Sequence, residues 1–206
     1  MKLDTSKMGR IELHDLVGTA ISPLPVVFIS TVGKDGTYNA APFAFASPVC
    51  SRPPIICISI GHRGGERKHT LKNIEFSHDF VINVVDEAIL SRAVQCSADY
   101  PYGVDEMKEN GLTAVKSDLV KAPRIAEAKV NLECKLVQIV DILEDYKDGI
   151  GLRGLVMGEV LMAHVSDDVA TPEGGIDPRR LKAVGRIASG VYIKNWETFE
   201  LKARWV

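Results

Sequence analysis

The sequence predicts a mainly β fold, in which an antiparallel sheet curves into a closed or partly open barrel and a few short helices lie outside it. Two observations lead to this prediction. About seven or eight strand-like segments follow one another and are mostly joined by short turns. Alternating strand–helix units, which build doubly wound parallel sheets, are missing from the pattern. Closure of the sheet would also remove the exposed edges that such a series of strands otherwise leaves.

Length and composition favour one globular domain, residues 1–206. A chain of 206 residues can bury a sizeable core without disulfide or metal cross-links. Its apolar share of 46% and charged share of 25% are ordinary for a globular protein. A formal net charge of -2 gives no indication of a nucleic-acid or anionic membrane partner. We therefore expect neither partner.

The beginning of the chain and its cysteines indicate a cytoplasmic protein. The first residues contain no apolar core of signal-peptide length. No apolar run approaches the roughly 18 to 20 residues that a membrane span needs. The four cysteines are scattered without a C-x-x-C spacing, at positions Cys50, Cys57, Cys96 and Cys134. We interpret them as reduced and structural.

The first strands form a hairpin over Val26–Ser47. Val26–Thr31 is rich in β-branched residues and predicts a strand. The Asp-Gly pair at 35–36 is typical of a tight turn, because it supplies a residue that tolerates positive φ. Tyr38–Ser47 continues as the second strand. Pro42 within it indicates an edge strand or a bulge, because proline lacks the donor for a ladder hydrogen bond.

The middle of the chain alternates short strands, loops and helices. Ser51–Pro54 predicts a connector, because residues before proline avoid the helical region. The following predictions are a buried strand at Ile55–Ile60, a polar glycine-rich loop at Gly61–Thr70, a helix capped by Thr70 and running through Phe76, a strand at Phe80–Val85, and a helix Glu87–Ser97 capped by Asp86.

The last third of the chain predicts a long pair of strands and a shorter terminal pair. Tyr100–Gly111 is aromatic and rich in turn residues, with a short helix that ends at Gly111. The remaining predictions are strands at Lys129–Ile142 and Gly154–Val165 joined through a turn at Asp148-Gly149, an exposed loop at Asp167–Arg180, and strands at Val191–Ile193 and Thr198–Trp205.

Small residues are concentrated in the second strand, from Asn39 to Ala46. Alternation places Ala40, Pro42, Ala44 and Ala46 on one face and Ala41, Phe43 and Phe45 on the other. The first face is nearly flat, and Pro42 removes one ladder donor. Such a surface can accept a planar heterocycle and hydrogen-bond its edge. The alternative is a sheet packed closely on a helix, which also favours alanine.

The loop Gly61–Thr70 predicts an anion site. It contains Arg63, Arg67 and Lys68 but one acid, Glu66. Its glycines allow backbone N–H groups to converge, and the helix that follows would direct its N-terminal amides to the same point. The alternative is a solvated basic loop. A flat seat and a phosphate site on neighbouring strands together predict a flavin mononucleotide (FMN) site.

The sequence resembles the flavin reductase-like family, whose fold is the FMN-binding split barrel. The matching segments, in order, are Asn39–Phe43 with Phe45, Arg52–Pro54, the Lys-x-Thr-x-x-Asn-Ile pattern at 68–74, Phe80–Val85, Ala126–Cys134 and Gly158–Val160. The resemblance spans about residues 20 to 195. The chain departs from the family at Ala44, where serine is frequent, at His69, where aspartate is usual, and at Ala188-Ser189, which replaces Gly-Gly.

The resemblance implies FMN held between two subunits of a homodimer. The residues that it implies for the isoalloxazine ring are Asn39, Ala41, Pro42, Phe43 and Ala44; for the ribityl chain Ser59, Ile60 and Gly61; and for the phosphate Arg67, Lys68 and Thr70. Asn83 on the adjacent strand is a further candidate, with an amide that supports the strand ladder as its alternative.

The function implied is that of an FMN-dependent oxidoreductase, which takes hydride from NAD(P)H and passes electrons to free flavin, a ferric chelate, a quinone or a partner protein. Stacking and orientation suffice for this chemistry, so we predict no catalytic side chain and no metal site. The alternatives are a non-catalytic FMN-binding electron carrier and a barrel that has lost its cofactor. The sequence leaves open the acceptor, the choice between NADH and NADPH, whether flavin is a bound cofactor or a released product, and the roles of Tyr100, Tyr102, Arg186 and Tyr192.

Overall fold

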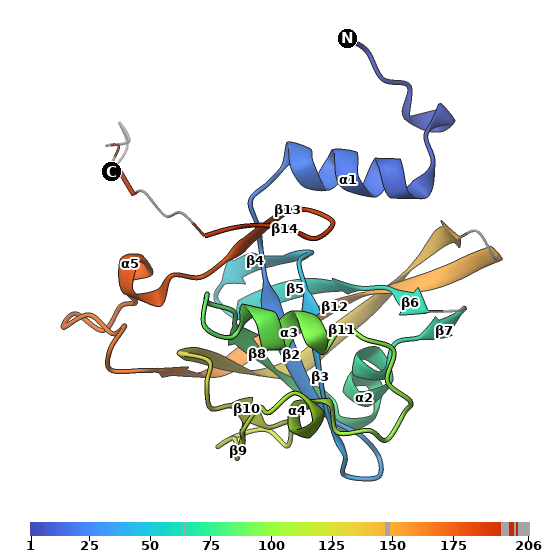
Figure 1. Cartoon of the computed structure of the whole chain (residues 1–206). Coiled ribbons are helices and arrows are strands. Elements are labelled where there is room, and N and C mark those ends of the chain that lie inside the picture. Colours follow the sequence, from blue (N-terminus) through green and yellow to red (C-terminus); the bar gives the residue numbers. More distant parts are fainter. Residues whose placement is uncertain (64, 147–148, 195–197, 200, 202–206) are drawn as a thin grey trace.

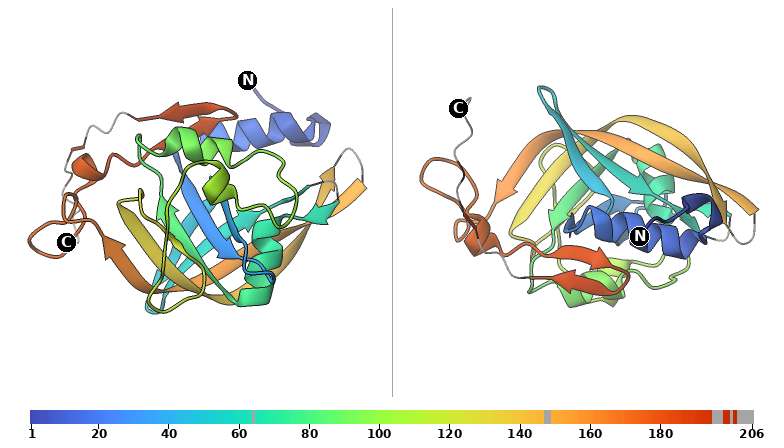
Figure 2. Two further views of the ribbon diagram at one scale, coloured as in Figure 1. Left: turned by 60° about the horizontal axis from the view of Figure 1, so that its bottom comes forward. Right: turned by 90° about the horizontal axis from the view of Figure 1, so that it is seen from above.

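The structure, a computed structural model, is built on a seven-stranded antiparallel sheet that curves into a barrel (Figures 1 and 2). It describes residues 1–63, 65–146, 149–194, 198–199 and 201. The strand order is β3-β2-β8-β11-β12-β5-β4. The strands are β2 (Val27–Val32), β3 (Tyr38–Phe43), β4 (Ala46–Ser51), β5 (Pro54–Ile60), β8 (Asp79–Val84), β11 (Val130–Tyr146) and β12 (Gly149–Val165). The predicted antiparallel, mainly β architecture is therefore confirmed.

Shorter elements surround the barrel. The helices are η1 (Thr5–Lys7), α1 (Arg10–Ala20), α2 (His69–Ser77), α3 (Leu90–Gln95), α4 (Glu106–Glu109) and α5 (Pro178–Leu181). The small sheets are β1 (Leu24–Pro25) with β13 (Gly185–Ala188) and β14 (Val191–Ile193), β9 (Ala114–Val115) with β10 (Arg124–Ile125), and β6 (His62–Arg63) with β7 (Glu66–Arg67). Figure 2 shows α1 and the β13–β14 hairpin side by side over one end of the barrel.

The two edges of the large sheet meet where β3 continues into β4. These are the first and last strands of the sheet, and Ala44 and Phe45 alone connect them. The carbonyl of Phe45 accepts a hydrogen bond from the Ser59 backbone nitrogen at 2.8 Å, next to the Ala46–Ile58 pair of β4 and β5. The barrel is thus joined by this connection and stays split beside it. Pro42 lies on an edge strand, as predicted.

Alternation along β2 divides the core into two clusters. Ile29 packs inside the barrel with Ile58, Phe80 and other apolar residues. Its neighbour Phe28 points to the opposite face and packs under α3 with Ile89. Successive strand residues point to opposite faces, so one strand supplies both clusters. Both faces of β2 are therefore buried.

Several boundaries differ from the prediction. Helix α2 begins at His69 with Lys68 as its N-cap residue, so the predicted cap at Thr70 is wrong. Thr70 is buried inside the first turn instead. Asp86 accepts hydrogen bonds from the Ala88 and Ile89 backbone nitrogens as an N-cap would, but regular helix α3 begins only at Leu90.

Other regular elements are longer than predicted or were not predicted. The β11–β12 pair is longer than predicted, helix α1 was not predicted, and the loop 167–180 contains part of α5. Asp148, Trp196, Trp205 and most of the strand predicted at 198–205 lie outside the described residues.

All four cysteines are free of disulfides, and Cys96 and Cys134 are buried. Within the described part of the chain, no helix is both long enough and apolar enough to cross a membrane.

Candidate functional site

Two adjacent cavities lie where the barrel is split. One, of about 330 Å³, is lined by residues of α2 and of the β7–α2 connection, and we call it the α2 cavity. The other, of about 300 Å³, is lined in part by Arg10 and His14 of α1, and we call it the α1 cavity. Pro42, Arg63 and Lys68 line both cavities. A ligand longer than either cavity could therefore extend from one to the other past Pro42.

Strand β3 supplies part of the flat surface that the sequence predicts. Ala41 and Pro42 line the α2 cavity, and Pro42 and Ala44 line the α1 cavity. Ala40, however, is fully buried in the cluster under α3. For Ala40 the alternative of close packing on a helix is therefore correct, because α3 and α4 cover that face of β3.

The α1 cavity is lined by Pro42–Phe45, where β3 continues into β4, and by Ser59 and Gly61 at the end of β5. These two segments lie side by side, because the Ser59 backbone nitrogen donates to the Phe45 carbonyl at 2.8 Å. Aromatic rings lie at its margin: the Lys68 ammonium is 5.5 Å from the centre of the Phe43 ring. Pro42, Ala44, Ser59 and Gly61 have little side-chain bulk and leave room beside them for a flat ring.

The α1 cavity is strongly cationic. Its lining includes Arg10, Arg63, Lys68, Arg153 and Arg186, and no carboxylate is found among the described residues that line it. Arg153 donates a hydrogen bond to the Ser59 hydroxyl at 3.3 Å. Burial lowers the pKa of Lys68, and the nearby Arg63 and Arg153 lower it further. Cations that repel one another in this way are stabilised when an anion binds among them.

The predicted phosphate ligands behave differently from one another. Lys68 lines both cavities. Arg67 lines the α2 cavity but forms ion pairs with Glu75 and, at 2.7 Å, with Asp141. The Thr70 hydroxyl donates to the Asn39 side-chain oxygen at 3.0 Å. A phosphate in the α2 cavity would thus meet Lys68 directly but would compete with carboxylates for Arg67.

Glu106 is a buried acid in the α2 cavity that the sequence analysis missed. Its carboxylate accepts hydrogen bonds from the Asn39 amide at 2.6 Å and from the Ala40 backbone nitrogen at 2.9 Å. Burial raises the pKa of Glu106 to about 7, despite the Ala40 hydrogen bond. Glu106 lies in a turn-rich segment with no periodic pattern, so no sequence signal pointed to it.

Asn39 is the centre of a buried polar network. Its side-chain oxygen accepts hydrogen bonds from Thr31 at 3.2 Å and from Thr70 at 3.0 Å. The network continues through Asn73 to the Tyr102 hydroxyl, which lies 3.0 Å from the Asn73 oxygen. Tyr100 lines the α2 cavity. Asn39 therefore fixes the wall of the cavity and links it to the aromatic segment.

Two predicted site residues lie away from both cavities. Ile60 is fully buried in the barrel core, between Ser59 and Gly61, which both line the α1 cavity. The Asn83 amide donates to the Phe28 carbonyl at 2.9 Å, and its oxygen accepts from the Ile125 backbone nitrogen at 2.9 Å. These bonds support the alternative interpretation of Asn83, in which the amide supports the strand ladder.

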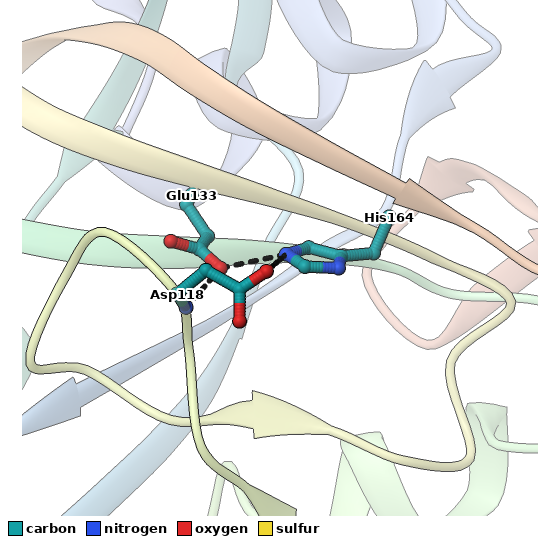
Figure 3. Close-up of side chains that lie close together, drawn as sticks. All are labelled: Asp118, Glu133 and His164. Atoms are coloured by element: carbon teal, nitrogen blue, oxygen red, sulfur yellow. Dashed lines mark hydrogen bonds and ion pairs between the residues drawn. The ribbon is translucent and has the colours of Figure 1, made fainter.

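A separate polar cluster lies on β11, β12 and the loop before β10 (Figure 3). His164 Nε2 is 2.6 Å from Glu133 Oε1 and 3.9 Å from the Asp118 carboxylate. Glu133 also accepts backbone hydrogen bonds from Asp118 at 2.8 Å and Leu119 at 2.7 Å. Although the three residues could provide ligands to a metal ion, both Glu133 oxygens are already hydrogen-bonded, so the cluster anchors the loop.

Comparisons with known proteins agree over nearly the whole chain. The family model described as "Flavin reductase like domain" matches residues 19–183. An uncharacterized protein of Halalkalibacterium halodurans is 36% identical over 202 residues, which make up 98% of this chain and 95% of the relative.

Two solved structures are similar along their full length. Nitrilotriacetate monooxygenase component B from Bacillus cereus has a TM-score of 0.91 at 28% identity, with 98% of each chain covered. The 2-nitrobenzoate 2-nitroreductase NbaA from Pseudomonas fluorescens has a TM-score of 0.86 at 25% identity, with 98% of this chain and 96% of that chain covered. The antiparallel split barrel expected from the sequence is confirmed.

Proposed function

This chain belongs to the flavin reductase-like family, and from that membership we propose that it is an FMN-dependent oxidoreductase that takes hydride from NAD(P)H. It passes the electrons to free flavin, a ferric chelate or a partner protein. Family and solved neighbours support the coarser statement, a redox role with a flavin cofactor. The observation that carries the finer proposal is the pair of adjacent cavities, which share Pro42, Arg63 and Lys68 and so place small residues and cations side by side.

The residues present fit a flavin mononucleotide. Pro42, Ala44, Ser59 and Gly61 offer little side-chain bulk against a flat ring. Lys68, which lines both cavities, lies where a ligand would pass from one to the other. An elongated ligand with a flat ring at one end and a phosphate at the other would match this arrangement. When bound, the flavin supplies the hydride-accepting and electron-releasing chemistry.

The role of the protein in this proposal is to bind and orient. Asn39, fixed by Glu106 and Thr70, holds the β3 wall in place. Lys68, with Thr70 at the start of α2, binds the phosphate, where the helix N-terminus adds favourable dipoles. Cations around the α1 cavity favour negative charge on whatever occupies it. No side chain has to act as a general acid or base in this scheme.

We propose further that the active species is a homodimer with the flavin site near the subunit interface. Figure 1 shows that the β11–β12 hairpin extends beyond the barrel. Its β11 strand presents apolar side chains to solvent, among them Val137, 55% exposed, and Leu143, 73% exposed. Exposed apolar surface of this kind is typical of protein–protein contacts. A second copy of the chain is the partner that the family resemblance implies.

Anaerobic reduction tests the proposal. The purified protein, loaded with FMN, is mixed with NADH or with NADPH, and the flavin absorption is followed. Bleaching by at least one of the two nicotinamides is the expected result. A loaded protein that bleaches with dithionite but with neither nicotinamide is an electron carrier, and a protein that takes up no FMN has lost the cofactor; either result would end the proposal of an NAD(P)H-dependent enzyme.

A further inference from the structure

The α1 cavity brings together three arginines and a histidine from distant parts of the sequence. Arg10 and His14 come from α1, Arg153 from β12 and Arg186 from β13. The chain achieves this because α1 packs beside β13 over the end of the barrel (Figure 2). None of the four residues lines the α2 cavity, so they form a group apart from Arg67 and Thr70.

Contacts with the rest of the protein hold this group in place. Arg153 donates to the Ser59 hydroxyl at 3.3 Å, and Arg186 Nε donates to the Ala188 carbonyl at 3.1 Å. The Nη2 atom of Arg186 lies 3.5 Å from His14 Nε2. The His14 ring packs on Phe45, with 5.1 Å between ring centres. An ordered set of donors loses little freedom when an oxyanion binds, which favours specific recognition.

The charges in the group lie close enough to affect one another. Burial lowers the pKa of His14, the charges of Arg186, Arg153 and Arg10 lower it further, and the Asp15 carboxylate opposes the shift. Lys68, which lines the same cavity, is also affected by Arg153. A group with several like charges is better matched by a dianionic or pyrophosphate group than by one carboxylate, because each guanidinium can bind a separate oxygen.

We propose that Arg10, His14, Arg153 and Arg186 form a second oxyanion site, which binds the pyrophosphate of the nicotinamide dinucleotide while Lys68 holds the flavin phosphate. This inference rests on the proposed function, because it assigns the place of the second substrate. Pro42 lines both cavities, so a dinucleotide anchored at this group would lie beside the proposed ring seat. The same group could instead bind the phosphate of FMN, and the test separates these two sources.

The test compares Arg10→Gln and Arg186→Gln with the control Arg180→Gln. Arg10 is exposed on α1, so its substitution leaves the core intact. Arg180 is an exposed arginine on α5 that pairs with Asp177 at 3.3 Å and lines neither cavity. Calorimetry first measures binding of ADP-ribose, the redox-inactive part of the donor that carries the pyrophosphate. We expect each cavity variant to bind it about tenfold more weakly than the wild type or the control.

Kinetics gives a second readout. The rate of flavin reduction is measured with NADH and with 1-methyl-1,4-dihydronicotinamide, a hydride donor that has no phosphate. The ratio of the two second-order rate constants should fall about tenfold in Arg10→Gln and in Arg186→Gln and stay constant in Arg180→Gln. A merely structural role would change both donors alike and leave the ratio constant, which would overturn the inference.

Flavin titrations identify the source of the phosphate. If either cavity variant weakens FMN binding but not riboflavin binding, the group holds the flavin phosphate and the inference is wrong. It is also wrong if the wild type does not bind ADP-ribose. Failure of the proposed function is a different outcome: the wild type would then not be reduced by NADH or NADPH, while the ADP-ribose titration would still show whether the pyrophosphate site exists.

Discussion

The carboxylate of Glu106 lies 2.6 Å from the side-chain nitrogen of Asn39, so the residue that fixes the cavity wall is itself held by a buried acid. Glu106 is 5% exposed and accepts a second hydrogen bond from the Ala40 backbone nitrogen. Asn39 then offers its oxygen to Thr31 and Thr70. The edge strand β3 is thereby connected to α2 and α4 at the cavity.

Glu106 should make the stability of the protein depend on pH. Burial raises its pKa from 4.5 to about 7, so between these values the folded state binds more protons than the unfolded state. The stabilising contribution of the protonated acid is complete below about pH 4.5 and is lost as the pH rises through about 7. Since one pKa unit corresponds to about 1.4 kcal/mol, Glu106→Gln should raise the free energy of unfolding at pH 8 by up to about 3 kcal/mol.

Urea unfolding of wild type and Glu106→Gln at pH 5 and pH 8 measures this effect. The exposed Glu109 on the same helix provides the control, Glu109→Gln, which should leave the wild-type pH dependence in place. An equal free-energy difference between wild type and Glu106→Gln at both pH values would show that Glu106 does not titrate in this range.

Lys68 and Arg67 should contribute unequally to FMN binding, although they are neighbours in the predicted phosphate loop. Arg67 is occupied by Glu75 and Asp141, whereas Lys68 lines both cavities. A hydrogen bond to a charged group contributes about 1.5 to 3 kcal/mol, so Lys68→Ala should weaken FMN about 10- to 100-fold more than it weakens riboflavin. For Arg67→Ala we expect a difference of about threefold or less.

Fluorescence titration with the two flavins measures these ratios. The double variant Arg67→Ala, Lys68→Ala should show the same selectivity as Lys68→Ala alone. If Lys68→Ala weakened the binding of FMN and of riboflavin equally, Lys68 would not be the residue that binds the phosphate.

Glu133, the buried member of the polar cluster in Figure 3, should respond to acid in the opposite direction from Glu106. Although burial acts to raise the pKa of Glu133, the backbone hydrogen bonds from Asp118 and Leu119 and the contact with His164 lower it overall. This contribution to stability is present above about pH 4.5 and is lost as the pH falls through the folded-state value. Glu133→Gln places an NH₂ donor against existing donors, so we expect a loss of about 3 kcal/mol at pH 7.

Thermal or urea unfolding from pH 3 to pH 7 tests this expectation. The control is Asp118→Asn. The Asp118 side chain is 62% exposed, and its carboxylate comes no nearer than 3.9 Å to His164 Nε2, which is too far for a hydrogen bond. If Glu133→Gln had the same free energy of unfolding as the wild type at pH 7, the cluster would not anchor the loop.

The strands were predictable because their signals are local. Alternation, β-branched residues and the Asp-Gly turn place β2 and the start of β3 correctly, and Pro42 marks the edge strand. The strand predicted over Tyr38–Ser47 is wrong at its end, because β3 stops at Phe43 and Ala46 begins β4, which pairs at the other edge of the sheet. The boundaries of α2 were less predictable. Thr70 resembles an N-cap, but its hydroxyl is used by Asn39, a residue 31 positions away in the chain. Tertiary hydrogen bonding thus overrides a local capping preference.

The candidate site was predictable only in the part that is continuous in sequence. Asn39–Ala44 and the loop before α2 carry local composition signals, whereas Glu106 and Arg186 do not. Glu106 becomes notable only after α4 covers β3, and the position of Arg186, whose role the sequence left open, becomes clear only after β13 packs beside α1. The sequence pattern shows which residues are small or charged, and it cannot show which distant ones the barrel brings to one cavity.

The exposed apolar residues of β11 should hold the proposed homodimer together. Leu143 and Val137 are 73% and 55% exposed, which is costly for a monomer in water because large apolar side chains remain hydrated. Replacing both with aspartate would place desolvated charges in the proposed interface, so Val137→Asp, Leu143→Asp should shift sedimentation from dimer to monomer. Leu119, also exposed at 56% but in the loop before β10, provides the control Leu119→Asp, which should remain dimeric.

Because the flavin site is proposed to lie near the interface, the monomeric variant should also bind FMN more weakly while its circular dichroism spectrum stays that of a folded β protein. A wild type that sediments as a monomer, or a double variant that remains a dimer, would show that β11 is not the contact.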